Sequence, residues 1–247
     1  MIKKAINKLW PLFVCGLLFI HEAGAASIVP DTSAVMIDEL DKEGTIGIKN
    51  TEDKPILLYS KVVRLEDDPI DGALIPIPAA VIVQPGETQI VRLLFRSNGK
   101  LTQEHMARVI FTGIPQKEDA PGRVKLLIGH DLPIIIRPTG QPVVNDRWRY
   151  LKWRASADRL CVYNDSKMVI RYVNTVSLLP SQAVVTLPKP YSLPNSQNCG
   201  PLPEGFKPAA DMKVQFTAMS AYSYILNDLQ APLSDGNIPP DPTTKTH

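Results

Sequence analysis

After the first 25 residues, the sequence alternates between short apolar runs and polar segments that contain Asp, Pro and Gly. The runs are rich in Val, Ile, Leu and Thr, which is typical of β-strands. The polar segments carry turn chemistry, because Pro presets φ, Gly tolerates positive φ and Asp bonds the nearby backbone. In the first half of the chain we predict strands at residues 34–37, 45–50, 56–65, 80–83, 88–95, 106–114 and 124–136.

A second, smaller set of apolar runs follows a break in the pattern at residues 139–142. It starts with an aromatic and basic segment, residues 147–153. The strands predicted after it are residues 160–164, 171–179, 183–187, 211–217 and 223–227.

The first set has the spacing of a β-sandwich, since seven strands in about 110 residues fit an immunoglobulin-like domain. We therefore predict an all-β protein with an immunoglobulin-like domain at residues 26–140 and a second, smaller β domain at residues 141–230. The connection between them is too short for a flexible linker, which favours a fixed interdomain angle. Residues 231–247 are rich in Pro and Asp, and we expect them to form a mobile tail.

The composition agrees with a folded β protein. Of 247 residues, 44% are hydrophobic and 21% are charged, which excludes a disordered chain or a disulfide-dense miniprotein. There are 23 prolines, roughly twice the usual share of ~5%, so long uninterrupted helices are not expected.

The N-terminus has the three parts of a secretory signal peptide. Lys3, Lys4 and Lys8 precede an apolar run, and the small residues 23–25 mark a cleavage site before Ala26. The run is about 12 residues long where a membrane span needs ~20, so no membrane insertion is expected after cleavage. Cleavage of residues 1–25 leaves 24 basic and 24 acidic side chains, a balance that does not suggest nucleic-acid binding.

The cysteines point to one disulfide. Cys15 lies in the signal peptide, so Cys161 and Cys199 remain. In an oxidising compartment the simplest reading is a disulfide that closes a loop of about 38 residues and is worth ~3–4 kcal/mol. Two buried free thiols are the alternative.

Catalytic and metal-binding signals are missing from the sequence. It has neither a G-x-S-x-G elbow nor a phosphate-cradling Gly loop. The three histidines outside the signal peptide, His105, His130 and His247, are scattered without metal-ligand spacing. We predict no enzyme, no cofactor and no metal site.

One run carries apolar side chains in strict alternation. Val124, Leu126, Ile128, His130 and Leu132 share one face of a strand at period two. The simplest reading is that this face lines the core of the domain. Leu127 lies on the other face, so part of the strand is apolar on both sides. A two-sided apolar strand at a sheet edge could be lent to another protein by strand addition.

Four segments follow one another along both predicted domains. They are Pro85-Gly86 followed by Ile90-Val91-Arg92-Leu93, then Phe111-Thr112-Gly113-Ile114-Pro115, Ile134-Ile135-Ile136-Arg137-Pro138 and Tyr224-Ile225-Leu226-Asn227-Asp228. Each is weak alone, but their shared order over about 200 residues resembles the PapD-like family of periplasmic pilus chaperones.

The resemblance implies two immunoglobulin-like β-sandwich domains set as a boomerang around a cleft. It also implies a chaperone that binds, folds and caps pilus subunits in the periplasm. Such subunits lack their own last strand. The resemblance assigns Val124, Leu126 and Ile128 to a donated strand that fills the subunit groove, followed by delivery to an outer-membrane usher. An incomplete sandwich exposes apolar core and unpaired backbone groups, and a donated strand satisfies both.

The resemblance also assigns a structural role to four charged residues. Arg92, Glu104, Arg137 and Asp228 match the family's buried charge cluster. A buried Arg needs a carboxylate partner, so Glu104 and Asp228 would offset Arg137 and fix the interdomain angle. The alternative is that these charges are exposed and unrelated.

Two positions depart from the family pattern. The family anchors the subunit's terminal carboxylate with two basic residues, and this chain has Ser33 and Pro133 at the matching places. A Pro there also confines the site to a sheet edge or a bulge. Either the anchor is rebuilt from neighbours such as His130, Lys125 or Arg108, or the strand itself holds the client.

The runner-up function is a secreted two-domain binding module, either a pilus subunit or an adhesin, since a fold alone does not decide function. A pilus subunit would be one incomplete domain with an N-terminal donor extension. This chain instead starts its first predicted strand soon after the cleavage site and carries its alternating strand at the end of the first domain.

Overall fold

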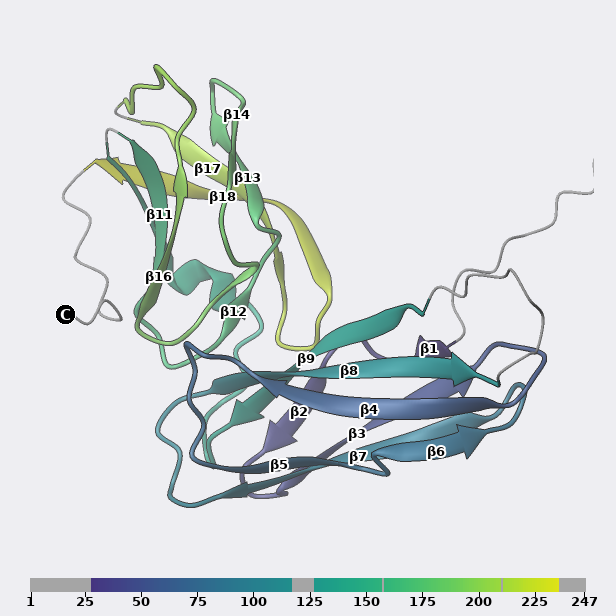
Figure 1. Ribbon diagram of the computed structural model, residues 1–247. Helices are drawn as coiled ribbons and strands as arrows, with labels where there is room; N and C mark the ends of the chain where they lie inside the picture. The colour runs from purple at the N-terminus through teal and green to yellow at the C-terminus, as the bar shows by residue number, and fades with distance from the viewer. Residues whose placement is uncertain (1–27, 117–126, 157, 210, 236–247) are drawn as a thin grey trace, which may run out of the picture.

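A computed structural model describes residues 28–116, 127–156, 158–209 and 211–235. Figure 1 shows two β-sandwiches, one after the other in the chain, that meet at an angle like the arms of a boomerang. The predicted all-β class with two immunoglobulin-like domains is confirmed. The predicted signal peptide and the residues Val124, Lys125 and Leu126 lie outside the described residues.

The first domain consists of two sheets that face each other. One has the order β1-β3-β7-β5, with β1 at Ile28–Pro30, β3 at Glu43–Asn50, β7 at Thr88–Ser97 and β5 at Gly72–Ile77. The other has the order β2-β9-β8-β4-β6, with β2 at Val35–Asp38, β9 at Gly129–Arg137, β8 at His105–Pro115, β4 at Ile56–Arg64 and β6 at Ala80–Val83.

Alternation along the strands builds the first core. In β4, Ile56 and Leu58 are buried while Leu57 and Tyr59 are exposed. Since successive side chains point to opposite faces, one face of each sheet contributes to the core and the other lies outside it.

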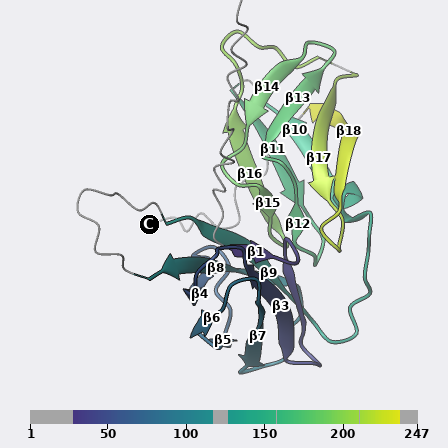
Figure 2. The ribbon, with the colours of Figure 1, turned by 90° about the vertical axis from the view of Figure 1, so that its right-hand side faces the viewer.

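The second domain begins with a short 3-10 helix and continues as a larger sheet. The helix η1 spans Arg147–Tyr150; the sheet has the order β14-β13-β17-β18-β10-β11-β16, with β14 at Ala183–Thr186, β13 at Thr175–Leu179, β17 at Lys213–Met219, β18 at Ile225–Asp235, β10 at Leu151–Ala155, β11 at Arg159–Asn164 and β16 at Ser196–Pro201. A separate pair joins β12 (Ile170–Arg171) and β15 (Tyr191–Ser192). Figure 2 shows these strands stacked above the first domain. No helix in the described part of the chain is long and apolar enough to span a membrane.

Aromatic rings fill the centre of the second core. The ring centroid of Trp153 lies 5.2 Å from that of Phe216 and 6.3 Å from that of Tyr172. The Tyr172 hydroxyl donates to the Tyr191 carbonyl (3.0 Å), so the buried hydroxyl has a partner.

The predicted disulfide is confirmed. Cys161 on β11 and Cys199 on β16 face each other in the antiparallel register and are bonded. The bond therefore joins neighbouring strands of the second domain.

Two boundaries differ from the sequence prediction. Residues 231–235 belong to β18, and Leu233 is buried opposite Trp153 in a parallel pairing with β10. The predicted start of the mobile tail at 231 is therefore wrong, because these residues have both backbone partners and an apolar contact. The predicted strand 124–136 is described only from Leu127, and β9 starts at Gly129.

Candidate functional site

Strand β9 has an open edge. It pairs with β8 along its length, from Gly129 opposite Thr112 to Ile136 opposite His105. On its other side the parallel partner β2 reaches only from Ile134 onward. Within the described residues, 129–133 are thus paired on one side only, and Pro133 stands at the last position before β2 joins. An edge is where a strand tolerates Pro and where a further strand can be added.

The burial of the core-facing side chains of β9 decreases from the C-terminal end of the strand toward its N-terminal end. Ile136 and Ile134 are fully buried, and Leu132 is partly buried against the same core. The side chain of His130 is partly buried, and that of Ile128 is 42% exposed. The predicted alternating face therefore does two things: its C-terminal part lines the core, and its N-terminal part projects beyond it.

Ser33 and His130 line one shallow hollow at this edge. The hollow has a volume of about 340 Å³, and its other lining residues are Pro30, Asp31, Thr32 and Leu132. Asp31 Oδ2 accepts the Gly47 N–H at 3.0 Å, and a Cβ at Gly47 would lie only 2.6 Å from that oxygen. The hollow is thus lined by a carboxylate and by no Lys or Arg of the described chain.

The outward face of β9 looks toward the second domain, and a cation lies beside Pro133. Arg108 of β8 is its cross-strand neighbour, so the two side chains share a face. The Arg108 Nε donates to Asp131 Oδ1 (2.7 Å) and its Nη2 donates to the Asp131 carbonyl (2.9 Å).

A buried ion pair joins the two domains. Glu104, fully buried, accepts a hydrogen bond from Arg147 Nη1 (2.9 Å) and another from the Val169 N–H (2.8 Å), both at Oε2. The Glu104 N–H donates to the Lys167 carbonyl (2.8 Å). Arg147 was not among the predicted site residues. Sequence alone offers no signal for it, because a buried acid requires a cation without indicating which one.

The other three predicted members of the charge cluster lie elsewhere. Arg137 bonds Asp38 through Nε (2.5 Å) and Nη2 (2.8 Å), which raises the pKa of Arg137. Arg92 points outward between the buried Val91 and Leu93, and it pairs with Glu43 at the surface. Asp228 is exposed and accepts the Gln215 Nε2 donor at 2.8 Å.

The predicted single cluster is therefore wrong. Alternation along β7 turns residue 92 away from the core, and Asp228 lies within β18 at a positive φ of 56° where the pairing with β17 is irregular. Of the four residues, Glu104 is the one that lies buried between the domains.

Apolar contacts surround the interdomain ion pair. Met106 and Ile135 of the first domain pack with Val169, Tyr191 and Leu193 of the second. This cluster lies outside both domain cores. An ion pair between Lys189 and Asp67 adds a further link. Such an interface favours one fixed angle between the domains.

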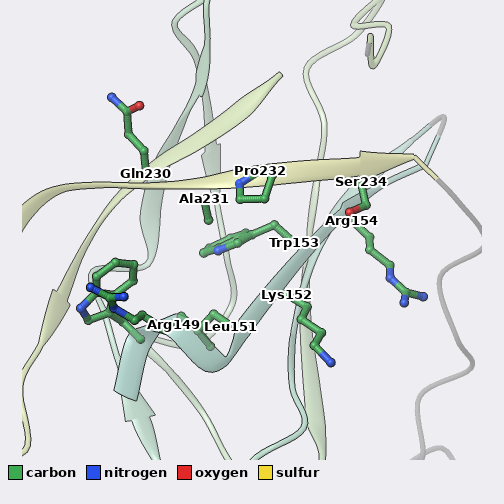
Figure 3. Close-up of a pocket in the computed structure, with 10 residues that line it drawn as sticks. Arg149, Leu151, Lys152, Trp153, Arg154, Gln230, Ala231, Pro232 and Ser234 are labelled. Atoms are coloured by element: carbon green, nitrogen blue, oxygen red, sulfur yellow. The ribbon is translucent and has the colours of Figure 1, made fainter. Parts of the chain in front are cut away.

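A second hollow lies on the second domain alone (Figure 3). It has a volume of about 420 Å³ between η1, β10 and β18, and its lining includes Trp148, Trp153 and Pro232. The Arg149 guanidinium lies 5.3 Å from the Trp148 ring centroid. None of the predicted site residues lines this hollow. Within the described ranges, no group of three or more His, Cys, Asp or Glu side chains could hold a metal ion.

Comparison with known proteins decides the family. Residues 27–142 match the family model of the pili and flagellar-assembly chaperone, PapD N-terminal domain. Over 200 residues the chain is 36% identical to the uncharacterized fimbrial chaperone YhcA of Escherichia coli strain K12, covering 81% of this chain and 88% of YhcA. This chain belongs to the PapD-like family of fimbrial chaperones.

Solved structures agree with the fold of this fimbrial chaperone. The E. coli chaperone DraB superposes with a TM-score of 0.66 at 20% identity, over 84% of this chain and 97% of DraB. The SafB chaperone of Salmonella enterica, solved in complex with the SafA pilin, matches with a TM-score of 0.66 at 18% identity, over 84% of this chain and 96% of that chain. The alternative of a pilus subunit or adhesin is not favoured.

Proposed function

We propose that this fimbrial chaperone captures unfinished pilus subunits with β9 and the residues before it, and that it delivers them to an outer-membrane usher. The open edge of β9 carries the proposal. Among the residues that the structure describes, one side of the strand lacks a partner along residues 129–133, and the apolar face runs from the core to the exposed Ile128. The SafB chaperone is known in complex with a pilin, and the CsuC chaperone of Acinetobacter baumannii in complex with a tip adhesion subunit.

The physical gain comes from two groups of interactions. A subunit that lacks a strand exposes apolar core, worth ~25 cal/mol per Å² when it is buried again. It also exposes backbone N–H and C=O groups that need partners. A strand with one open edge and one projecting apolar face supplies both kinds of contact.

Ile128 and Leu127 provide a matched test of the donor face. They are neighbours with similar exposure, 42% and 50%, so a charge at either should change folding little. Ile128→Asp places a carboxylate in the apolar groove of the subunit and should abolish copurification of the subunit. Leu127→Asp lies on the opposite face and should retain it. Equal capture by both variants, with unchanged thermal unfolding, would remove the donor assignment.

The predicted donors Val124 and Leu126 extend the same alternation. Leu126→Asp should also abolish capture, for the same reason. Normal capture by this variant would limit the donated face to the residues from Ile128 onward.

For the usher we propose an apolar row on the outer face of the same sheet. Leu57 of β4 lies opposite both Ile82 of β6 and Ile114 of β8 in the register, so the three side chains share one face. Leu57 is 40% and Ile82 is 61% exposed. Ile114 beside them is partly buried, and a row of adjacent apolar side chains that is largely exposed is typical of a protein-binding surface.

The usher proposal is tested with the preformed chaperone–subunit complex. Ile82→Glu should leave subunit capture intact and reduce retention of the complex on immobilised usher. Ile75→Glu, at an exposed position of the other sheet, is the control. Equal retention of both variants would contradict this docking surface.

Periplasmic residence belongs to the same proposal. The processed chain should start at Ala26 and appear in the osmotic-shock fraction of a piliated host. Mass spectrometry of the N-terminal peptide checks this, and a chain that keeps residues 1–25 would contradict it.

A further inference from the structure

Arg171, on β12 of the second domain, is a partly buried cation without a carboxylate partner. Its Nη2 donates to the Ser223 Oγ at 2.6 Å, and this is the one polar contact of the side chain within the described residues. A hydroxyl is neutral, so it does not offset the guanidinium charge. Cations that are removed from water in proteins are normally paired with an acid.

The surroundings of Arg171 increase this imbalance. Burial, together with the positive charges of Arg147 and Arg108, lowers the pKa of Arg171 to about 10. Glu104 acts in the opposite direction, but its Oε2 already accepts Arg147 and the Val169 N–H. Arg147 is paired with Glu104 and Arg108 with Asp131, so within the described chain Arg171 is the one of these three guanidinium groups that has no carboxylate partner.

Arg171 lies beside the interdomain interface. Its cross-strand neighbour is Tyr191, which packs with Met106 and Ile135 of the first domain. Arg108 lies two residues after Met106 on β8 and on the same face, and it is the cross-strand neighbour of Pro133. The two guanidinium groups therefore reach one region from different domains.

The β17–β18 hairpin brings Ser223 to this region. Figure 1 shows the hairpin reaching from the second domain to β9 on the inner side of the angle. A tight turn holds it, in which the Ser220 N–H donates to the Tyr224 carbonyl (2.9 Å) and the Ser223 N–H donates to the Ser220 carbonyl (3.0 Å). Exposed Tyr222 and Tyr224 flank the hydroxyl.

We infer that Arg171, together with Arg108, binds a carboxylate of the captured subunit and supplies the positive charge that Ser33 and Pro133 lack. The inference rests on the proposed function and adds to it a residue from the second domain. A guanidinium matches a carboxylate through two parallel N–H donors. The Ser223 hydroxyl can rotate to donate a third hydrogen bond.

Two forms of one peptide test the inference. The probe is a synthetic peptide with the C-terminal strand sequence of the pilus subunit that copurifies with the chain, made with a free carboxylate and as the C-terminal amide. Loss of one partner of a desolvated charge pair weakens binding by roughly 30-fold or more. The wild-type chain should therefore prefer the acid form by that factor in calorimetric titration.

The variants separate this role from a structural one. Arg171→Met should lose the preference for the acid form and should leave binding of the amide unchanged. It should unfold no more easily than wild type, because it removes an uncompensated cation. Arg171→Lys should retain part of the preference. Arg92→Met, which removes an exposed Arg paired with Glu43, is the control and should behave as wild type.

The outcomes are distinct from those of the proposed function. If neither peptide form binds and no subunit copurifies, the proposed function itself fails. If wild type binds both forms equally, but Arg171→Met weakens a peptide only when it has an acidic side chain, the carboxylate comes from that side chain and the inference stands. If Arg171→Met keeps the full preference for the acid form, the inference is overturned.

Discussion

The buried pair of Glu104 and Arg147 should hold the two domains as one unfolding unit. The exposed fractions of the two side chains are 0% and 4%. Glu104→Ala leaves the guanidinium buried without a partner, which costs ~3–5 kcal/mol. It also leaves the Val169 N–H without its acceptor, which costs a further ~1–3 kcal/mol. A loss of at least ~4 kcal/mol is large against a typical stability of ~5–15 kcal/mol.

A double variant separates the pair from its surroundings. Replacing a buried ion pair with apolar side chains of similar volume is often neutral. Glu104→Leu combined with Arg147→Met should therefore recover most of the loss, apart from the ~1–3 kcal/mol of the Val169 N–H. The two single changes and the double change form a cycle whose interaction energy isolates the pair.

Urea unfolding followed with two probes checks this. Far-UV circular dichroism reports both domains. Tryptophan fluorescence reports the second domain, because Trp148 and Trp153 are the only tryptophans after the signal peptide. The two curves should coincide in wild type and separate in Glu104→Ala. A single variant whose free energy of unfolding lies within ~1 kcal/mol of the wild-type value, the range of an exposed ion pair, would refute the reasoning. A double variant that is as unstable as the less stable single variant would refute it as well.

The remaining predictions concern the second domain. In the Glu104→Ala background, where the two domains should unfold separately, replacing Cys161 and Cys199 by Ser should lower the stability of the second domain by ~3–4 kcal/mol in the fluorescence transition, and an equal loss in the first domain would contradict separate unfolding. Leu233→Ala should cost ~2–4 kcal/mol, whereas a change below ~0.5 kcal/mol would restore the mobile-tail reading. Burial raises the pKa of Tyr172 and of Tyr191 to about 12 in the folded state, so the stability they contribute is complete below pH 10.0 and is lost as the pH rises toward 12. Tyr172→Phe should reduce that alkaline decline in melting temperature, and an unchanged decline would contradict the assignment.

The strands that sequence predicts best are those with a period-two apolar pattern. β4 and β8 alternate between core and exterior and were predicted within two residues of their bounds. β16 was not predicted, since its sequence is polar and contains Gly and Pro, and the disulfide and the pairing with β11 hold it in place. β5 was missed because Pro76 interrupts its pattern, although Pro is tolerated at a sheet edge.

In the candidate site, too, features set by local sequence were predictable, and features set by distant residues were not. The alternation around Ile128 and Leu132 is local, so sequence identifies the face, and the structure adds which part of it projects from the core. Ion-pair partners are not local. Glu104 and Arg147 are 43 residues apart and in different parts of the fold, and only the packing of the two domains brings them together.

An anion site that is shared by both domains would link capture to the interdomain angle. Arg108 belongs to the first domain and Arg171 to the second, so their separation is set by the contacts that include Glu104 and Arg147. The double variant Glu104→Leu with Arg147→Met keeps both guanidinium groups of the proposed site and removes one determinant of the angle. It should therefore remain folded but lose part of the preference for the acid form of the peptide. A folded double variant with the full preference would show that the apolar cluster of Met106, Ile135 and Tyr191 sets the angle without the ion pair.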